Sequence, residues 1–587
     1  MTRTLPLRAA PAVLIIVLCY PVIRPLLTTE LFIAHDVFFH ITHLHQFERA
    51  FHAGAIYPRW FPDVFEGYGA PVGVFYPLLT YYVAEIPRVL GAGIIDSWKW
   101  FVALGFIGSG IFQYLWTRKW LGEAGAWVSA IAYIYYPYHI LDAYVRGAFP
   151  EFLGFVWYPL VAWGVCNVAS RPTRRSIALA ALPIAALVAT HFPSAVLFLP
   201  VAVALGAAVI PEGQSRRCAL ALAAAVSIGV ALAAIAWLPF IAELKWVGLS
   251  AKSHHSFVQF ENHFVRPGQI VSRYWGFGGS LPPGLEDGMS FQVGWLHLAL
   301  APIGVFALIV TENRRRLGVI LAALLVLGLF LMLRPSDFLW QAIPVIRQVQ
   351  FPWRILSPIG LITATLAGAA LSWMIRQRPL PSAAWGPGLA AGAAGILLIL
   401  YSLPYCVASY RNRPVDPEKY PGAYRGSLWP ARVLEIRDRY LNEESLEEIA
   451  FEDPYYLPVH RTEAPSKRPP ARVEGPRSSE GIEIIDERPG RMAFRADYEE
   501  EVEVLVHLFH YPGWQARSDV AGRLPLRLDA ATGGIHLTIP PGPQVITVDF
   551  KTTAPRAYAA VLSLAALAVL VGLLLIRRAP ILRRTGP

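Results

Sequence analysis

The stretch AAPAVLIIVLCYPVIRPLLTTELFIAHDVFFHITHLHQFERAFHAG, residues 9–54, sets the fold class because it joins an apolar run to a polar helix. Residues 9–27 are almost wholly apolar and follow Arg3 and Arg8, as in a membrane helix with a cytoplasmic amino end. No small-residue cleavage site follows, so we expect an uncleaved first span and not a signal peptide. From Asp36 onward the sequence predicts an amphipathic helix beyond that span.

The remainder of the 587-residue chain repeats this alternation of apolar runs and charged turns. Hydrophobic residues make up 55% of the sequence and charged residues only 16%, whereas soluble proteins carry roughly 25% charged residues. The formal charge of +10 comes mostly from arginines beside apolar runs, so nucleic-acid binding is not expected. The four cysteines lie in or beside apolar runs without a CxxC pair, which argues against a disulfide framework or a cysteine metal site.

The arginine-rich turns predict the topology, because such turns stay on the cytoplasmic side of a membrane. With the amino terminus inside, the chain must cross an even number of times between consecutive turns. Counting apolar runs then gives about twelve transmembrane helices, with both termini cytoplasmic, in a multi-pass protein of the cytoplasmic (inner) membrane. The turns are Arg118-Lys119, 171–175, Arg216-Arg217, 314–316, 376–378 and the tail from Arg577.

The interval before Arg118 contains three apolar stretches, 9–27, 74–94 and 98–117, although parity allows only two crossings. The middle stretch, which contains Glu85 and two prolines, is predicted to lie on or dip into the outer leaflet. The first external loop then covers about 28–97.

Three regions are expected: a transmembrane module over 1–407, an extracytoplasmic domain over 408–553, and a last span with a basic tail over 554–587. The external domain opens with charged sequence that includes an acidic helical stretch, 441–450. Period-two alternation interrupted by Gly and Pro then predicts an antiparallel β-sandwich. The alternating segments are EVEVLVHLFHYPGW (501–514), RLPLRL (523–528), GGIHLTIP (533–540) and PQVITVDF (543–550).

The first external loop supplies the first candidate residues. Asp36, His40 and His43 fall on one face of the predicted helix. A carboxylate just beyond a span is costly unless it is solvated or paired, so Asp36 is the leading candidate, with a helix cap as the alternative. The two histidines could equally be ordinary interface residues. Asp63 and Glu66, further along the loop, are additional candidates.

Five motifs together resemble known membrane proteins. They are HDVFFH (35–40), YPRWFPDVFEGYG (57–69), YVRGAFPEFLGF (144–155), QFPWRIL (350–356) and HYPGWQA (510–516). The first helix and the long external loop with an early Asp resemble the glycosyltransferase C superfamily. The motifs also look like bacterial membrane proteins labelled "6-pyruvoyl-tetrahydropterin synthase-related". Pterin synthase activity itself is not expected, because His43 and His45 would point to different helix faces.

The superfamily resemblance implies transfer of a sugar from a polyprenyl-phosphate or polyprenyl-diphosphate donor to an extracytoplasmic glycan, lipid or protein. It also implies a second acidic group in the next external loop, where this chain has Asp142 and Glu151. The Asp-x-Asp spacing of metal-binding relatives is missing, but Asp36, Asp142, Glu151 and His40 could still bind Mg²⁺ or Mn²⁺. No nucleotide or organic cofactor is expected, since the chain has no phosphate-binding glycine loop.

Four basic residues are candidates for binding the donor phosphate: Arg146, Arg354, Arg347 and His191. A guanidinium can bind phosphate with two hydrogen bonds, although anchoring at the membrane interface, or a structural turn at His191, would also explain these residues. The expected reaction is a single displacement with inversion, in which Asp36 is either the general base or a metal ligand.

Two other functions fit the same topology. A lipid-linked glycan flippase would need ionisable groups deep within its spans. A non-catalytic envelope polysaccharide assembly protein would not need Asp36, Asp142 and Arg146 to meet in space.

Overall fold

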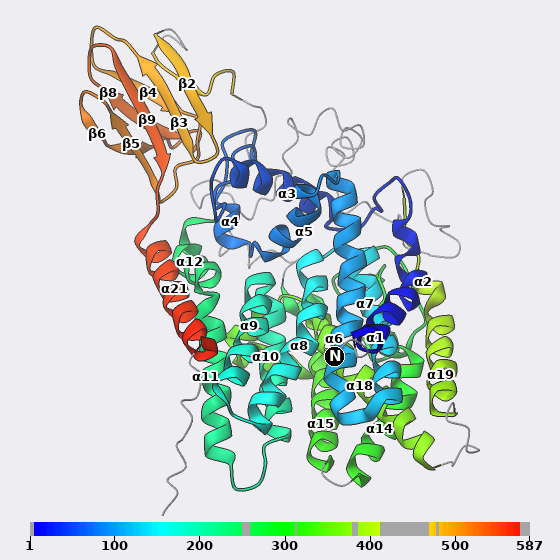
Figure 1. The fold of residues 1–587 in the computed structure, drawn as a ribbon. Coiled ribbons are helices and arrows are strands. Elements are labelled where there is room, and N and C mark those ends of the chain that lie inside the picture. Colours follow the sequence, from blue (N-terminus) through cyan, green and yellow to red (C-terminus); the bar gives the residue numbers. More distant parts are fainter. Residues whose placement is uncertain are drawn as a thin grey trace, which may run out of the picture.

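The computed structural model describes residues 5–248, 259–311, 314–377, 386–410, 469–476 and 481–575. Figure 1 shows a bundle of helices with a β-domain beyond one end, joined to the bundle through α21 (Ala554–Leu575). The predicted acidic helix at 441–450 lies outside the described residues.

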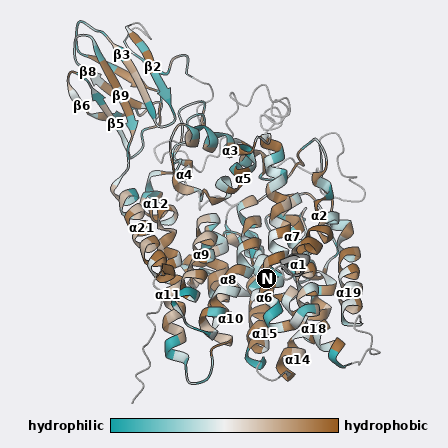
Figure 2. Cartoon of the chain, in the orientation of Figure 1, coloured by the Kyte–Doolittle hydropathy of each residue, from teal (hydrophilic) through white to brown (hydrophobic). Residues whose placement is uncertain are grey.

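The helices of the bundle follow the apolar runs of the sequence, since a backbone in lipid must satisfy its hydrogen bonds internally. Figure 2 shows hydrophobic residues along most of them. Their bounds are α1 (Leu5–Leu18), α2 (Tyr20–Ile23), α6 (Ile94–Ile134), α7 (Pro137–Leu141), α8 (Phe149–Ser170), α9 (Arg174–Thr190), α10 (Phe192–Ala208), α11 (Ser215–Leu232), α12 (Ala234–Glu243), α14 (Trp295–Val310), α15 (Arg315–Leu331), α18 (Leu356–Gln377) and α19 (Gly386–Ser402). Shorter helices in the loops are α13 (Pro267–Val271), α16 (Asp337–Ala342) and α17 (Pro344–Arg347).

Six helical segments in the described part are long and apolar enough, by length and composition, to cross a membrane. They are Ile94–Arg146, Phe149–Ser170, Ser215–Leu232, Pro352–Gln377, Gly386–Tyr405 and Ala554–Leu575. Two shorter apolar helices, α10 and α14, accompany them. The chain is thus a mainly helical membrane protein, while the number of about twelve spans stays a prediction.

The long helix α6 is two helices that meet at Gly122, where φ is 74° and ψ is −175°. The two halves fold back on each other, because the Tyr114 and Trp127 rings lie 5.1 Å apart and Gln113 Nε2 donates to Ser129 Oγ at 2.9 Å. The turn between them is the predicted Arg118-Lys119 turn.

At the centre of the bundle, α18 is buried along most of its length and packs against α6, α14 and α15. Glycines permit the closest approach: a Cβ on Gly368 would lie 2.3 Å from the carbonyl oxygen of Gly125. The helix that carries Arg354 at its start is therefore held rigidly.

The first external loop folds into α3 (Val37–His52), α4 (Val72–Phe75) and α5 (Leu79–Val89), which lie at the end of the bundle nearest the β-domain (Figure 1). Helix α5 has 11 residues, which at about 1.5 Å per residue is roughly half of the ~30 Å hydrocarbon core. A helix of this length would not cross a bilayer by itself, and the place of α5 on the outer side stays a prediction.

The β-domain consists of two antiparallel sheets whose buried apolar side chains belong to one core. The strand orders are β1-β4-β8-β7 and β2-β3-β9-β5-β6. The segment RLPLRL forms two short strands in different sheets, since Pro525, between them, cannot donate to a ladder. The bounds are β1 (Val473–Glu474), β2 (Ile482–Arg488), β3 (Arg491–Ala496), β4 (Val502–Val506), β5 (Trp514–Ser518), β6 (Gly522–Leu524), β7 (Leu526–Leu528), β8 (Ile535–Ile539) and β9 (Gln544–Phe550).

A buried ion pair attaches the β-domain to the bundle. Arg556, in the first turn of α21, donates from Nε and Nη2 to the two carboxylate oxygens of Glu243 at 2.9 and 2.7 Å. Tyr511 donates to Glu243 Oε2 at 2.9 Å, and Arg556 also donates to the Pro512 carbonyl at 3.1 Å. The HYPGW segment therefore docks on the carboxyl end of α12.

The first external loop also contacts the β-domain. The Trp60 ring packs edge-to-face on Trp514 at 4.9 Å and lies 5.0 Å from Phe550. Tyr68 and His507 are joined by a 2.7 Å hydrogen bond. Residues of the YPRWFPDVFEGYG and HYPGWQA motifs thus form an interface between domains.

Candidate functional site

Three segments that are distant in sequence meet at the start of α3: residues 35–37, residues 142–151 and the turn that contains Arg354. Backbone hydrogen bonds place the first two together: His35 N–H donates to the Val145 carbonyl at 3.1 Å, and Asp36 N–H to the Arg146 carbonyl at 2.8 Å. Asp36 thus occupies the N-cap position of α3 without making a side-chain cap bond, which leaves its carboxylate available.

Gly147 makes this approach possible. Its φ is +62°, a conformation that favours glycine, and a Cβ there would lie 2.7 Å from Val37 Cγ2 and 3.0 Å from Ala34 Cβ. The glycine ends the π-helical turn η2 (Asp142–Arg146), which carries the acidic and basic residues predicted for the second external loop.

Arg146 is the centre of a buried ion-pair cluster. Its Nη1 bonds to Asp142 Oδ1, to Glu151 Oε2 at 2.8 Å and to the Tyr138 hydroxyl at 3.0 Å. Tyr138 in turn donates to Glu151 Oε1 at 2.7 Å. Because each buried charge has a partner, the cluster avoids the several kcal/mol that an unpaired buried charge costs.

Arg354 joins the cluster from the 3₁₀ turn η8 (Pro352–Ile355), directly before α18. Its Nε donates to Glu151 Oε2 at 3.1 Å, and its Nη1 donates to the Val349 carbonyl at 2.8 Å. The turn before it contains Gln350 at φ +67°, a left-handed conformation that is uncommon for a non-glycine residue. Backbone strain of this kind is often found at functional sites.

The side chains of the cluster differ in their exposure to solvent. The side chains of Asp142, Glu151 and Arg146 are 0%, 1% and 5% exposed, whereas that of Arg354 is 12% exposed. Asp36 is half-buried. Asp36 and Arg354 are therefore the more exposed charges of the cluster.

His191, between α9 and α10, lies on the same side of the cluster and is half-buried. Its Nδ1 is 2.8 Å from Ser194 Oγ, and it is within electrostatic reach of Arg354, Glu151 and Arg146. The structure thus places His191 near Arg146 and Arg354, two of the other candidates for binding the donor phosphate.

The environment of Asp36 suits a proton acceptor. Burial raises the pKa of Asp36 above its ordinary value, although the charges of Arg146, His35 and Arg354 act in the opposite direction. A carboxylate with a raised pKa is a stronger base than a solvated one.

The Mg²⁺ or Mn²⁺ site considered from the sequence stays a prediction, and an arginine already lies among its proposed ligands. Arg146 lies between Asp142 and Glu151 and already supplies the positive charge that a cation would supply there. Asp142 Oδ2 is buried without a hydrogen-bond partner among the described residues.

The two α3 histidines contact the same residue of α5. His40 Nδ1 and His43 Nδ1 each lie 3.1 Å from the Tyr81 hydroxyl, so both are tied to α5. His40 also stacks on Phe149 at 5.1 Å. They form a buried layer between the external loop and α8, which accounts for them without a metal.

The other candidates lie in local structural contacts. Asp63 accepts from Gln46 Nε2 at 2.7 Å and pairs with Arg49, which fastens the loop to α3. Arg347 donates from Nε to the Trp340 carbonyl at 3.1 Å. Glu66 occupies a left-handed turn at φ +56°. None of these contacts connects these residues to the Arg146 cluster.

Two cluster residues were not singled out from the sequence. Tyr138 precedes Asp142 and Arg146 at intervals of four residues, the spacing of one helical face, and this spacing could have indicated it. Trp353 supports the Arg146 guanidinium, which lies 4.6 Å above its ring. The motif QFPWRIL shows that Trp353 is next to Arg354, but the sequence does not show that Trp353 contacts Arg146.

No protein-family model matches this sequence, and no curated protein matches it. Among solved structures, the cryo-EM structure of the arabinofuranosyltransferase AftD from Mycobacteria is similar, with a TM-score of 0.45 and 16% identity over 74% of this chain. A structure of an AftD mutant is similar with a TM-score of 0.40 and 15% identity. This chain covers 28% and 30% of those chains, so it matches less than a third of their length. A likeness of this size does not assign a function, and no match supports the narrower resemblance to the pterin synthase-related proteins.

Proposed function

We propose that this chain is a membrane glycosyltransferase that moves a sugar from a polyprenyl-phosphate or polyprenyl-diphosphate donor to an acceptor outside the cytoplasmic membrane. One observation carries the proposal: Asp36, the Asp142–Arg146–Glu151 group and Arg354 come from three separate segments and meet in one charged cluster. A donor with an anionic headgroup needs cationic groups beside a base, and this cluster supplies both.

Asp36 is the proposed general base. The acceptor hydroxyl oxygen attacks the anomeric carbon, its proton passes to Asp36, and the carbon–oxygen bond to the donor phosphate breaks. The polyprenyl phosphate leaves with the bonding electron pair, and the configuration at the anomeric carbon inverts. The acceptor and the sugar are not specified by this chemistry.

Arg354 is the proposed phosphate ligand, with His191 beside it. Glu151 fixes Arg354 through Nε, so that the outer edge of the guanidinium can face the donor. Arg146 is a positioning residue in this scheme, since it holds Glu151 and Asp142 and its carbonyl accepts from the Asp36 amide. The β-domain, which contacts the first external loop, is expected to shape the acceptor site and not to supply reacting groups.

The arrangement favours an enzyme over a flippase. The charges of the cluster lie at the starts of α3, α8 and α18 and in the turn η2, not at mid-helix. A flippase would need such groups along a path through the bilayer. The meeting of Asp36, Asp142 and Arg146 also argues against an assembly protein without a site.

The decisive variant is Asp36→Asn, which keeps the size and hydrogen bonding of the side chain but removes its basicity. We expect transfer from a polyprenyl-phosphate-linked sugar to fall by roughly 10²-fold or more. The wild-type rate should rise with pH as Asp36 loses its proton. Because burial raises the pKa of Asp36, the midpoint of this rise should lie above about 3.9, the ordinary pKa of an aspartate. Purified protein, a panel of radiolabelled lipid-linked sugars and product detection by mass spectrometry would measure both.

The matched control is Asp96→Asn, at the start of α6, where the aspartate side chain is 62% exposed and pairs with Lys99. This variant should transfer sugar at the wild-type rate. If Asp36→Asn retained near-normal transfer at equal expression, Asp36 would not be the base. Failure of every lipid-linked donor with folded wild-type protein would count against the enzyme itself.

A further inference from the structure

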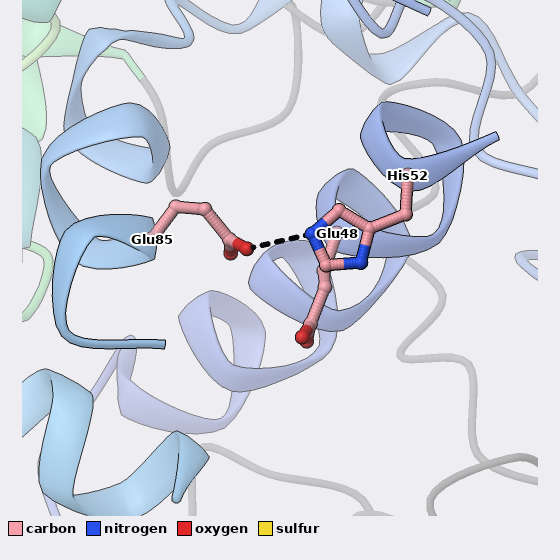
Figure 3. A group of neighbouring side chains, drawn as sticks. All are labelled: Glu48, His52 and Glu85. Carbon is pink, nitrogen blue, oxygen red and sulfur yellow. Dashed lines mark ion pairs between the residues drawn. The ribbon is translucent and has the colours of Figure 1, made fainter. Parts of the chain in front are cut away.

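A second group of chemically reactive side chains lies in the first external loop, away from the Arg146 cluster. Glu48 and His52 stand one turn apart near the end of α3, and Glu85 faces them from α5 (Figure 3). One donor atom from each residue lies within 4.8 Å of the others. Among the described residues, these three form the group of His, Cys, Asp or Glu side chains whose possible ligand atoms lie this close together.

Glu85 is the unusual member. Its side chain is only 4% exposed, and among the described residues its carboxylate has no well-aligned hydrogen bond; its ion-pair partner is His52, whose Nε2 lies 3.3 Å from Oε1. Figure 3 shows the carboxylate directed at the imidazole. A buried carboxylate aimed at a second acid and an imidazole is expensive without a positive charge between them.

Glu48 is held in position from the other side. Arg88 donates from Nη2 to Glu48 Oε1 and Oε2 at 2.9 and 3.1 Å. A carboxylate has about four lone-pair positions, so this contact leaves some for a further ligand. Outer hydrogen bonds of this kind orient carboxylates that bind metals. The local formal charge of Glu48, Glu85 and Arg88 is still negative.

We propose that Glu48, His52 and Glu85 bind one divalent transition-metal ion of the zinc type. Two carboxylates and an imidazole are ligands that zinc accepts, whereas Mg²⁺ and Ca²⁺ prefer oxygen alone. Ligands at about 2.1 Å from a tetrahedral zinc are about 3.4 Å apart, close to the 3.3 Å between His52 Nε2 and Glu85 Oε1. His52 is 56% exposed, so water can complete the coordination.

The site would join the end of α3 to α5 inside the first external loop. It uses none of the residues assigned to sugar transfer, and the proposal does not depend on that function. Its expected effect is structural, because a bound metal would hold α3 against the helix that also carries Tyr81.

The test is metal binding by the full-length protein in detergent, purified with a tag free of histidine and washed with a chelator. Titration with Zn²⁺ should give one tight site per chain, with weaker binding of Mn²⁺ and much weaker binding of Mg²⁺ and Ca²⁺. Zn²⁺ should also raise the midpoint of thermal unfolding. His52→Ala and Glu85→Gln should each weaken zinc binding by roughly 100-fold or more, since even outer-shell changes cost 10–100-fold.

Two controls make the result decisive. Glu123→Gln, an exposed glutamate paired with Arg118, and Asp36→Asn should both bind zinc as the wild type does. His52→Ala removes an exposed side chain, so the variant should fold even where Glu85→Gln does not. Absence of a stoichiometric zinc site in the wild type, or unchanged zinc affinity in His52→Ala, would overturn the proposal.

Discussion

Gly147 determines whether the proposed base can reach the ion-pair cluster. We predict that Gly147→Ala displaces residues 34–37, because the new methyl group would lie 2.7 Å from Val37 Cγ2. The left-handed backbone adds about 1–2 kcal/mol of strain. Sugar transfer should fall at least tenfold while the protein still inserts in the membrane, and the rate per folded molecule is the measurement.

A variant at Gly213 is the control that distinguishes the effect of backbone strain from the effect of displacing residues 34–37. It has φ +73° in the turn between α10 and α11, but a Cβ there would have nothing within 4 Å. Gly213→Ala should lose similar stability and keep its transfer rate. Equal loss of transfer in both variants would show that Gly147 acts only through stability.

At the same scale, the sequence could indicate which residues matter but not which ones pair. Asp36, Glu151 and Arg354 stand out because a charge beside an apolar run is costly unless it has a partner. Their partners depend on how α3, α8 and α18 pack. His40 shows the limit: its spacing fits a ligand on a helix face, yet the Tyr81 hydroxyl lies 3.1 Å from its Nδ1.

Helix α5 tests the topology at the scale of an element. If α5 stays on the outer side, positions before and after it face the same compartment. Ile56 and Leu90 are 84% and 82% exposed, and the four native cysteines are buried. We expect an impermeant maleimide added outside intact cells to label both Ile56→Cys and Leu90→Cys.

A crossing at α5 would instead expose position 90 to the cytoplasm, so labelling of Leu90→Cys only after the membrane is opened would reject the twelve-span arrangement. A cysteine in the Arg118-Lys119 turn gives the comparison. Lys119→Cys should be labelled only in opened membranes, because that turn is predicted to be cytoplasmic.

Other elements show what local pattern can and cannot predict. The alternating segments at 501–514, 533–540 and 543–550 contain β4, β8 and β9, since alternation reflects one buried face. The division of 523–528 between two sheets follows from Pro525 and from the turn of the chain at that point. The π-helical turn at Asp142–Arg146 has no comparable sequence signal, because the docking of residues 35 and 36 on its carbonyls stabilises it.

Over the whole molecule, the five motifs divide into two kinds. HDVFFH, YVRGAFPEFLGF and QFPWRIL supply Asp36, Arg146, Glu151 and Arg354 to one cluster. YPRWFPDVFEGYG and HYPGWQA supply Trp60, Tyr68, Tyr511 and Trp514 to the interface between the external loop and the β-domain. The sequence did not distinguish the motifs that supply the charged cluster from those that form the domain interface, because both kinds combine aromatic residues, glycine and proline.

The Glu243–Arg556 pair should decide whether the β-domain stays docked. Both side chains are nearly fully buried, at 3% and 1% exposure. Arg556→Met would leave Glu243 buried without its cation, at a cost of about 3–5 kcal/mol. We expect a lower thermal midpoint and faster proteolytic release of the β-domain in detergent.

The double variant Glu243→Leu with Arg556→Met should recover most of this loss, since apolar residues of similar volume often replace a buried ion pair without net cost. Arg495→Met is the matched control in the same domain. Arg495 pairs with Glu483 where the two side chains are 55% and 64% exposed, and such a pair contributes at most about 1 kcal/mol. If Arg556→Met released the β-domain no faster than Arg495→Met, the domain would be held by the Trp60 contacts instead. A detached domain with unchanged sugar transfer would also show that the β-domain does not shape the acceptor site.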